Sequence, residues 1–289
     1  MDVGLVGLGI MGGAMASNLL RAGHRVVGFD VDTLKTAALA GEGLVMAGSV
    51  AEVAGAVEIV ILSLPTPAAL HQVTDELVEC GVTGLLCLET GTLPLEDKIA
   101  ARDRLAAAGI ELMDVPLSGT GLQARDATLV VLASGSSTGY VAAEPVFAAI
   151  GRSHHFLGEF GNGSRMKYIA NLLVAVHNLA TAEAHALGIA SGMDPAVVQE
   201  VMEDGVGSSK IFEIRGPMMV ADDYPPAARL DIILKDAGLI AGYARSVGAP
   251  TPLLDSALAV YEEASAAGLG DFDAAVLCRY LEQMGGLSR

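Results

Sequence analysis

The first half of the chain alternates short apolar runs with amphipathic segments. Runs rich in Val, Leu and Ile predict strands, and the segments between them have the spacing of helices. The predicted strands are 3–6, 25–29, 44–46, 58–62, 85–88, 111–113, 128–132 and 154–157. The predicted helices are 12–22, 33–40, 67–79, 95–108 and 138–149. Strands separated by helices of this length favour an α/β fold, with a doubly wound, mainly parallel sheet that is covered on both faces.

The pattern changes after residue 163. Residues 164–191 are compatible with one long helix, because they contain no Pro and no Gly before Gly188. Further helices are predicted at 194–204, 229–247, 251–267 and 272–285. We therefore expect an α/β domain at 1–162 and an all-helical domain at 163–289, with the boundary in the glycine-rich stretch 158–163. The default ligand site of this arrangement is a cleft at the carboxyl ends of the strands, between the domains.

A glycine-rich turn lies between the first predicted strand and the first predicted helix. Gly7, Gly9 and Gly12 form a Gly-x-Gly-x-x-Gly run, which in this context is typical of a dinucleotide-binding turn. Asp30 ends the second predicted strand, where a carboxylate accepts hydrogen bonds from a ribose 2′-hydroxyl and repels a 2′-phosphate. No Arg occupies positions 31–34, so the pattern favours NAD over NADP. The alternative is a glycine-rich α/β turn that binds no ligand.

Composition and charge narrow the possible partners. The net charge of −17 argues against nucleic acid and anionic membranes as partners. We find no run of 18 apolar residues and no basic segment at the N-terminus, so we expect no membrane span, no secretory signal and a cytoplasmic location. Cys80, Cys87 and Cys278 have no metal-ligand spacing and indicate reduced thiols, and we expect no metal site.

Two further segments carry candidate chemistry. Residues 114–121 follow a predicted strand, and successive backbone N–H groups in such a Pro- and Gly-containing turn suit a substrate carboxylate. Lys167 and Asn171 lie four residues apart at the start of the long helix, on one face, where a lysine amine can exchange protons. The alternatives are an ordinary surface turn, and a solvated Lys with a capping or packing Asn.

A third candidate is Lys235, followed by Asp236, on another predicted helix. Lys235 would supply positive charge to a carboxylate in a chain that has few lysines. The alternative is a surface salt bridge between the two side chains.

Four ordered segments together resemble the motifs of the β-hydroxyacid dehydrogenase family, which includes 3-hydroxyisobutyrate dehydrogenases and tartronate semialdehyde reductases. They are residues 7–12, residues 114–129, residues 158–171 and the pair Lys235-Asp236. The segments follow the family's order, and the resemblance runs from residue 1 to about 275. It implies a Rossmann-type domain joined by a long interdomain helix to an all-α domain, and a homodimer or homotetramer.

The resemblance also implies roles for individual residues. Lys167 would be the general acid/base and Asn171 its hydrogen-bonding partner. The carboxylate end of the substrate would be bound by Ser118, Gly119, Thr120 and Lys235. The nicotinamide cofactor would be bound by Gly7, Gly9, Ile10, Met11, Gly12, Asp30, Pro65, Thr66, Thr90 and Lys235.

Two positions depart from the family pattern. Thr120 stands where the family usually has Gly, so a side chain intrudes on the substrate loop and its hydroxyl suits a polyhydroxylated substrate. Ala228 stands where a Phe is usual, which reshapes a pocket wall.

These observations together predict an NAD-dependent oxidoreductase. It would transfer a hydride between the nicotinamide and the C3 hydroxyl of a small anionic 3-hydroxy acid, or reduce the matching semialdehyde. Two alternatives stay open at this point. One is an enzyme similar to imine reductases, a related group that generally lacks the catalytic lysine, and the other is a non-catalytic dinucleotide-binding protein.

Overall fold

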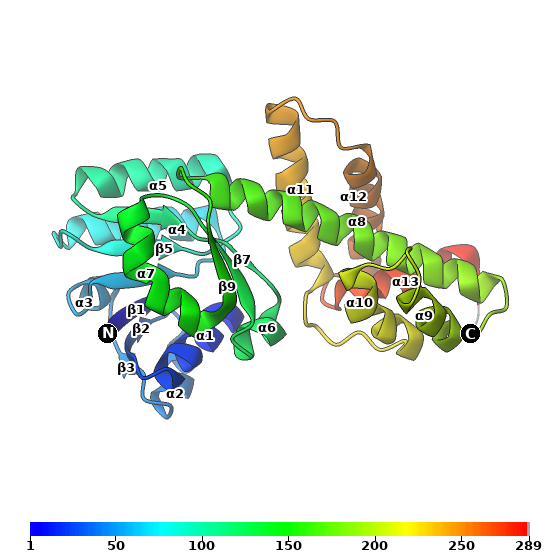
Figure 1. Cartoon of the computed structure of the whole chain (residues 1–289), viewed down its shortest axis with the longest axis horizontal. Helices are drawn as coiled ribbons and strands as arrows, with labels where there is room; N and C mark the ends of the chain where they lie inside the picture. The colour runs from blue at the N-terminus through cyan, green and yellow to red at the C-terminus, as the bar shows by residue number, and fades with distance from the viewer. Residues whose placement is uncertain (288–289) are drawn as a thin grey trace. The chain divides into compact units, whose positions relative to one another are not determined.

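A computed structural model describes residues 1–287 of the chain. It divides into two units, the first of which is Met1–Lys167 and the second of which begins at Tyr168 (Figure 1). The first unit contains all the strands that the structure describes, and the described part of the second unit is helical. An α/β unit followed by an all-helical one is the order that the sequence predicts.

The first unit is built on a six-stranded parallel sheet with the strand order β3-β2-β1-β4-β5-β6. This is the order of a doubly wound dinucleotide-binding sheet, in which the strand order reverses between β1 and β4. The central strands β4 and β5 are buried along their whole length, as expected when helices cover both faces. The strands are β1 (Asp2–Val6), β2 (Arg25–Phe29), β3 (Val45–Met46), β4 (Ile59–Leu62), β5 (Leu86–Glu89) and β6 (Glu111–Asp114).

Two hydrophobic cores flank this sheet, one for each face. The first core includes Met15 and Leu19 of α1 and Phe147 of α7. The second includes Leu77 of α4 and Leu105 of α5. The helices of this unit are α1 (Ile10–Arg21), α2 (Thr33–Ala40), α3 (Val50–Ala54), α4 (Pro67–Glu79), α5 (Leu95–Ala107), α6 (Gly121–Arg125) and α7 (Ser137–Ile150).

A second, three-stranded sheet follows β6. It consists of β7 (Leu117–Ser118), β8 (Leu129–Ala133) and β9 (Gly151–Phe156), with β7 antiparallel and β9 parallel to β8. The sequence pattern predicts a turn at 114–121, whereas the chain there forms the short strand β7 and begins helix α6. The loop therefore has a fixed register, because Ser118 pairs with Val130.

The second unit is formed by the long helix α8 and the helices after it. By length and composition alone, α8 is apolar enough to cross a membrane, and 44% of its most apolar window is buried. A core helix passes the same test, so this finding does not identify a membrane protein. The elements are α8 (Asn162–Ala190), α9 (Pro195–Glu203), α10 (Lys210–Ala221), α11 (Leu230–Ser246), α12 (Pro252–Ala264), η1 (Ser265–Leu269), η2 (Ala274–Val276) and α13 (Leu277–Gly285).

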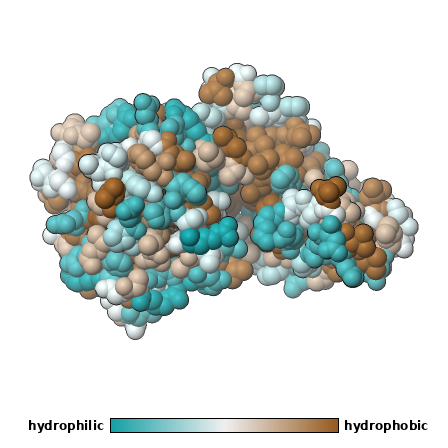
Figure 2. Space-filling model, in the orientation of Figure 1, coloured by the Kyte–Doolittle hydropathy of each residue, from teal (hydrophilic) through white to brown (hydrophobic). Residues whose placement is uncertain are grey.

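Apolar side chains also lie on the surface of the second unit. Figure 2 shows hydrophobic surface gathered over this part of the chain. Exposed apolar residues there include Ile169 and Leu173 of α8 and Leu253 of α12. Exposed apolar residues that gather in one region are typical of an interaction surface.

Candidate active site

The glycine turn joins β1 to α1, and two of its glycines are required by close backbone packing. Gly7 has a φ of +91°, and a Cβ there would lie 2.3 Å from the carbonyl oxygen of Ser63. A Cβ on Gly12 would lie 1.9 Å from the carbonyl oxygen of Gly7. Neither position accepts a side chain, so both glycines hold α1 close to the sheet.

Gly9 differs from these two glycines. A Cβ built on Gly9 meets no atom of the described residues within 4 Å. Gly9 is also the N-cap of α1, which begins with Ile10 and Met11, and it makes no side-chain cap bond. A helix N-terminus with open space beside it attracts a phosphate group through its N–H groups and its partial positive charge. The residues present therefore fit the pyrophosphate of a dinucleotide.

Asp30 follows β2 and is buried beside the glycine turn. Its Oδ2 accepts a hydrogen bond from the backbone N–H of Leu8 at 2.7 Å, and its Oδ1 accepts one from that of Asp32 at 2.8 Å. The ammonium group of Lys35 lies 3.4 Å from Oδ1. The carboxylate thus holds the glycine turn in shape, a role that its position in the sequence does not reveal.

The predicted nicotinamide-side residues follow β4 and β5. The Thr90 hydroxyl donates to the carbonyl of Leu62 at 2.8 Å, which ties together the ends of the two strands. Thr66 is the N-cap of α4, and its Oγ1 accepts from the N–H of Ala69 at 3.2 Å. Pro65 precedes it in the loop after β4. These residues, like Gly7 and Asp30, follow the carboxyl ends of parallel strands, where ligands bind in such sheets.

The predicted substrate loop is ordered by its own side chains. Gly119 has a φ of +139°, a conformation that favours glycine. Thr120 is the N-cap of α6 in a capping box: its N–H donates to Gln123 Oε1 at 2.8 Å, and its hydroxyl donates to the same oxygen at 2.6 Å. The side chain that departs from the family pattern therefore has a local structural role.

Lys167 lies in the second turn of α8 and is only 8% exposed. The start of α8 is tied to β6 within the first unit. The N–H and the hydroxyl of Ser164 donate to the two carboxylate oxygens of Asp114, at 2.7 and 2.8 Å. Lys167 follows Ser164 by three residues on the same helix face.

The other predicted residues of the site lie in the second unit, where the structure brings them together through Asp236. The side-chain amide of Asn171 donates to Asp236 Oδ2 at 2.8 Å. The ammonium group of Lys235 lies 3.1 Å from Asp236 Oδ1. Asp236 is thus the common partner of two residues that the sequence predicts separately.

Sequence reasoning missed a buried charge cluster around Lys98 of α5. Its ammonium group lies 2.5 Å from Glu89 Oε2 and 2.9 Å from Asp114 Oδ1, and all three side chains are fully buried. Burial acts to lower the pKa of Lys98, but the two carboxylates outweigh it and hold that pKa above its ordinary value. Burial raises the pKa of Glu89, and the charge of Lys98 offsets this in part. The available signal was that Lys98 lies at helical spacing from Leu95 and Ala101, on the buried stripe of α5.

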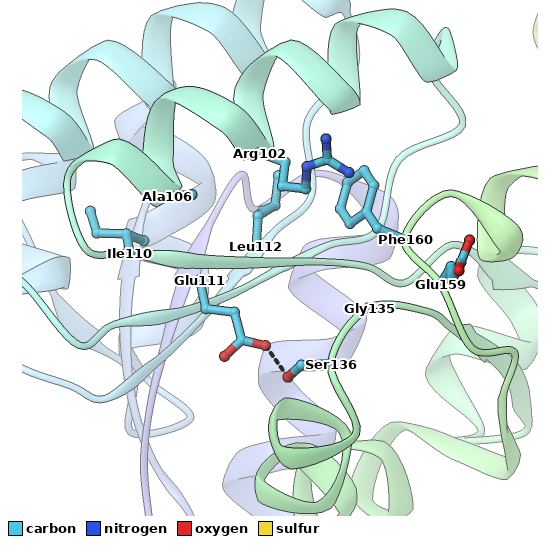
Figure 3. A pocket seen from close by; sticks show the side chains of 9 residues that line it. All are labelled: Arg102, Ala106, Ile110, Glu111, Leu112, Gly135, Ser136, Glu159 and Phe160. Carbon is cyan, nitrogen blue, oxygen red and sulfur yellow. Dashed lines mark hydrogen bonds between the residues drawn. The ribbon is translucent and has the colours of Figure 1, made fainter.

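A separate surface cavity of about 480 Å³ lies in the first unit (Figure 3). None of the residues predicted for the cofactor, the substrate or the proton transfer lines it. The residues that line the cavity are Arg102, Ala106, Ile110, Glu111, Leu112, Gly135, Ser136, Glu159 and Phe160.

Within residues 1–287, no group of three His, Cys, Asp or Glu side chains is arranged to hold a metal ion.

Two family matches cover most of the chain. Residues 2–158 match the NAD binding domain of 6-phosphogluconate dehydrogenase. Residues 161–281 match the domain described as NAD-binding of NADP-dependent 3-hydroxyisobutyrate dehydrogenase. The matches support a nicotinamide cofactor without choosing between NAD and NADP.

Individual proteins are similar over nearly the whole chain. The chain is 34% identical to an L-threonate dehydrogenase of Cupriavidus necator, over 94% of this chain and 93% of that protein. It is 34% identical to a 3-hydroxyisobutyrate dehydrogenase of Pseudomonas aeruginosa, over 87% and 88% of the two chains. The crystal structure of a 3-hydroxyisobutyrate dehydrogenase from Salmonella typhimurium is 33% identical, with a TM-score of 0.88 over 97% of this chain and 99% of that one. A Streptomyces aurantiacus imine reductase is more distant, at 19% identity and a TM-score of 0.67 over 97% and 99%, and shares the fold alone.

Proposed function

The chain belongs to the β-hydroxyacid dehydrogenase family, and from this premise we propose that it transfers a hydride reversibly between NAD and C3 of a small 3-hydroxy acid. In the reverse direction it reduces the matching semialdehyde. Membership makes the protein a nicotinamide-dependent oxidoreductase. The observation that carries the proposal is the glycine turn, with open space at Gly9, in the same unit as the buried Lys167.

In this proposal, Lys167 moves the proton of the reaction. When bound, the nicotinamide supplies the hydride acceptor or donor. During oxidation the Lys167 Nζ accepts the proton of the C3 hydroxyl, and during reduction it returns a proton to the forming alkoxide. A general acid or base in this position contributes about 10²–10⁴-fold to the rate. The burial of Lys167 excludes most of the water that would compete for the proton.

The remaining residues bind and orient the substrate. Ser118, Gly119 and Thr120, between the end of β7 and the start of α6, hold its carboxylate, with Lys235 adding positive charge. Asn171 holds the substrate hydroxyl or Lys167. The hydrogen bond to Asp236 fixes the side-chain amide of Asn171 and supports its role. The half-exposed side chain of Lys235 pairs with Asp236, which is the surface salt bridge that the sequence also allows.

We propose NAD as the cofactor rather than NADP. Asp30 and Asp32 put two carboxylates beside the position of the ribose, against the single ammonium group of Lys35. This local excess of negative charge repels a 2′-phosphate.

The proposal also covers the roles of the two domains, the oligomeric state and the location of the protein. Residues 1–162 would bind the cofactor, and 163–289 would complete the substrate site and form a homodimer or homotetramer. The exposed apolar residues of α8 and α12 support association, because such surface is usually covered. We propose a cytoplasmic location, because the three cysteines indicate reduced thiols. The net charge of −17 disfavours nucleic acid and anionic membranes as partners.

A panel of three- to five-carbon hydroxy acids, read by NADH absorbance, tests the proposal. The parent should oxidise at least one of them. Lys167→Ala should lower kcat by about 10²–10⁴-fold, while the Kd for NAD stays nearly unchanged. Lys210→Ala is the matched control, because Lys210 is exposed and pairs only with Glu213 among the contacts described. Activity of Lys167→Ala within a few-fold of the parent would refute the role of Lys167.

The alternatives are outcomes of the same experiment. Turnover of cyclic imines in place of hydroxy acids would identify an imine reductase. NAD binding without turnover on the whole panel would identify a non-catalytic dinucleotide-binding protein.

A further inference from the structure

A single buried carboxylate, that of Asp114, holds the start of helix α8. Asp114 ends β6 and is fully buried. Its side chain accepts from the N–H and the hydroxyl of Ser164, and from the hydroxyl of Ser134 at 3.2 Å. Ser164 is in the first turn of α8, where backbone N–H groups have no partner within the helix. Asp114 therefore supplies both a hydrogen-bond acceptor and a favourable negative charge at this helix N-terminus.

The backbone around this contact has almost no free space. A Cβ on Gly163 would lie 2.4 Å from the carbonyl oxygen of Leu132 and 2.8 Å from that of Asp114. The N–H of Gly163 donates to Ser134 Oγ at 2.9 Å. The first turn of α8 thus packs in one position against β6 and β8, and the carboxylate of Asp114 holds it there.

Helix α5 contacts the start of α8 from another side. A Cβ on Gly161 would lie 2.9 Å from Leu95 Cδ1. The guanidinium group of Arg102 lies 5.0 Å from the ring centroid of Phe160, and Figure 3 shows the two side chains next to each other. Lys98, between these contacts on α5, pairs with Asp114.

The charge of this cluster is costly for stability alone. Removing three charged groups from water carries a large desolvation penalty, and apolar residues of similar volume often replace such clusters without loss of stability. A charged hydrogen-bond acceptor instead makes a directional contact. It fixes where the first turn of α8 begins, and an apolar contact does not.

Lys167 lies three residues after Ser164, about 4.5 Å further along the helix axis and on the same face. We propose that Asp114, with Lys98 as its counter-ion, is a positioning residue for Lys167. The inference rests on the proposed function, since it takes Lys167 as the acid/base. A misplacement of about 1 Å at a reacting group costs about 10²-fold in rate. Weakening the contacts of Asp114 with the first turn of α8 therefore reduces turnover even in a folded protein.

Two variants of different severity test the role. Asp114→Asn puts an amide donor against either Ser164 or Lys98, and we expect kcat to fall about 10- to 100-fold, with the Kd for NAD within about twofold. Ser164→Ala keeps the N–H cap and loses the hydroxyl contact, and we expect a fall in kcat of about 3- to 10-fold. The second variant carries the test if the first does not fold.

Ser136→Ala is the matched control. Ser136 is the N-cap of α7 in the same unit and accepts from the N–H of Gly139 at 2.9 Å. Its loss should lower Tm about as much as Ser164→Ala does, with kcat within about twofold of the parent. An equal fall in kcat for both serine variants would show a general stability effect and overturn the proposal.

A double-mutant cycle with Lys167→Ala separates positioning from plain structural support. If Asp114 acts through Lys167, then Asp114→Asn lowers kcat by less than about twofold in the Lys167→Ala background. The same cycle with Ser164→Ala should give the same result. Full, additive losses in that background, or parental kcat in both single variants, would overturn the inference. Failure of the proposed function itself looks different, because the parent then oxidises no hydroxy acid or Lys167→Ala stays active.

Discussion

Replacing Gly9 by Ala should weaken dinucleotide binding without harming the fold. A Cβ at this position meets no described atom within 4 Å, so the protein has room for the methyl group. The φ of Gly9 is −65°, which Ala adopts without the strain of a left-handed conformation. The methyl group would instead enter the space that we assign to the pyrophosphate.

The expected magnitudes follow from this geometry. A Gly to Ala change at a compatible backbone conformation stabilises a protein by about 0.4–1 kcal/mol, because the unfolded chain becomes less flexible. We therefore expect the Tm without cofactor to be unchanged or slightly higher. Forcing one extra methyl group into a filled contact costs about 1–3 kcal/mol. This corresponds to a Kd for NAD that is about 5- to 150-fold weaker.

Fluorescence titration with NADH and thermal unfolding measure the two effects separately. Gly41→Ala is a matched control, because its Cβ also meets no described atom within 4 Å and Gly41 lies at the end of α2. It should leave the Kd for NAD unchanged. Gly12→Ala should instead unfold at a lower temperature, since its Cβ would lie 1.9 Å from the Gly7 oxygen. Parental NAD affinity in Gly9→Ala would refute the assignment of the phosphate site.

Three further predictions concern specificity, local structure and pH. Asp30→Ala should lower the ratio of kcat/KM for NAD over NADP by about tenfold or more, because a charge close to the 2′-phosphate is removed; steady-state rates with both cofactors measure this, and an unchanged ratio contradicts it. Thr120→Ala should lower the free energy of unfolding by about 1 kcal/mol, because α6 loses its N-cap; Thr120→Ser is the control in urea denaturation, and equal stability of Thr120→Ala and the parent would speak against the cap. Burial raises the pKa of Cys87 to about 12 and that of Tyr261 to about 12. Both pKa values are higher in the folded protein than in the unfolded chain, so the two neutral groups contribute to the free energy of unfolding. This contribution is complete below about pH 9 and is lost as the pH rises toward 12. Urea denaturation between pH 8 and 11 measures the loss, a flatter dependence in Cys87→Ala supports it, and a constant free energy of unfolding contradicts it.

Much of the fold could be predicted because local signals agree with the tertiary structure. Helix α4 begins after the N-cap Thr66 with Pro67 in its first turn, and its predicted bounds are confirmed. The central strands are apolar throughout because both faces are covered. The sequence pattern does not predict helix α10, because this helix contains Gly216 and Pro217, which usually mark a break. A Cβ on Gly216 would lie 1.8 Å from Gln199 Oε1, so a larger residue there requires the Gln199 side chain to move.

The site was predictable only as far as its residues follow strand ends or helical spacing. The spacing of Thr120 and Gln123 is that of a capping box, but Thr120 also lies in the candidate substrate loop, so the sequence pattern is compatible with both a cap and a ligand. The pairing of Lys98 with Glu89 and Asp114 joins α5, β5 and β6. No local pattern specifies such a contact, because it depends on how separate elements pack.

The proposed reaction is direct hydride transfer between the hydroxyl-bearing carbon of a 3-hydroxy acid and the nicotinamide ring. Oxidation of a substrate with deuterium on C3, followed by mass spectrometry and NMR of the reduced cofactor, tests it most directly. Direct transfer places deuterium at C4 of the nicotinamide in each turnover. Reduced cofactor without deuterium, or loss of the label to water, would contradict it.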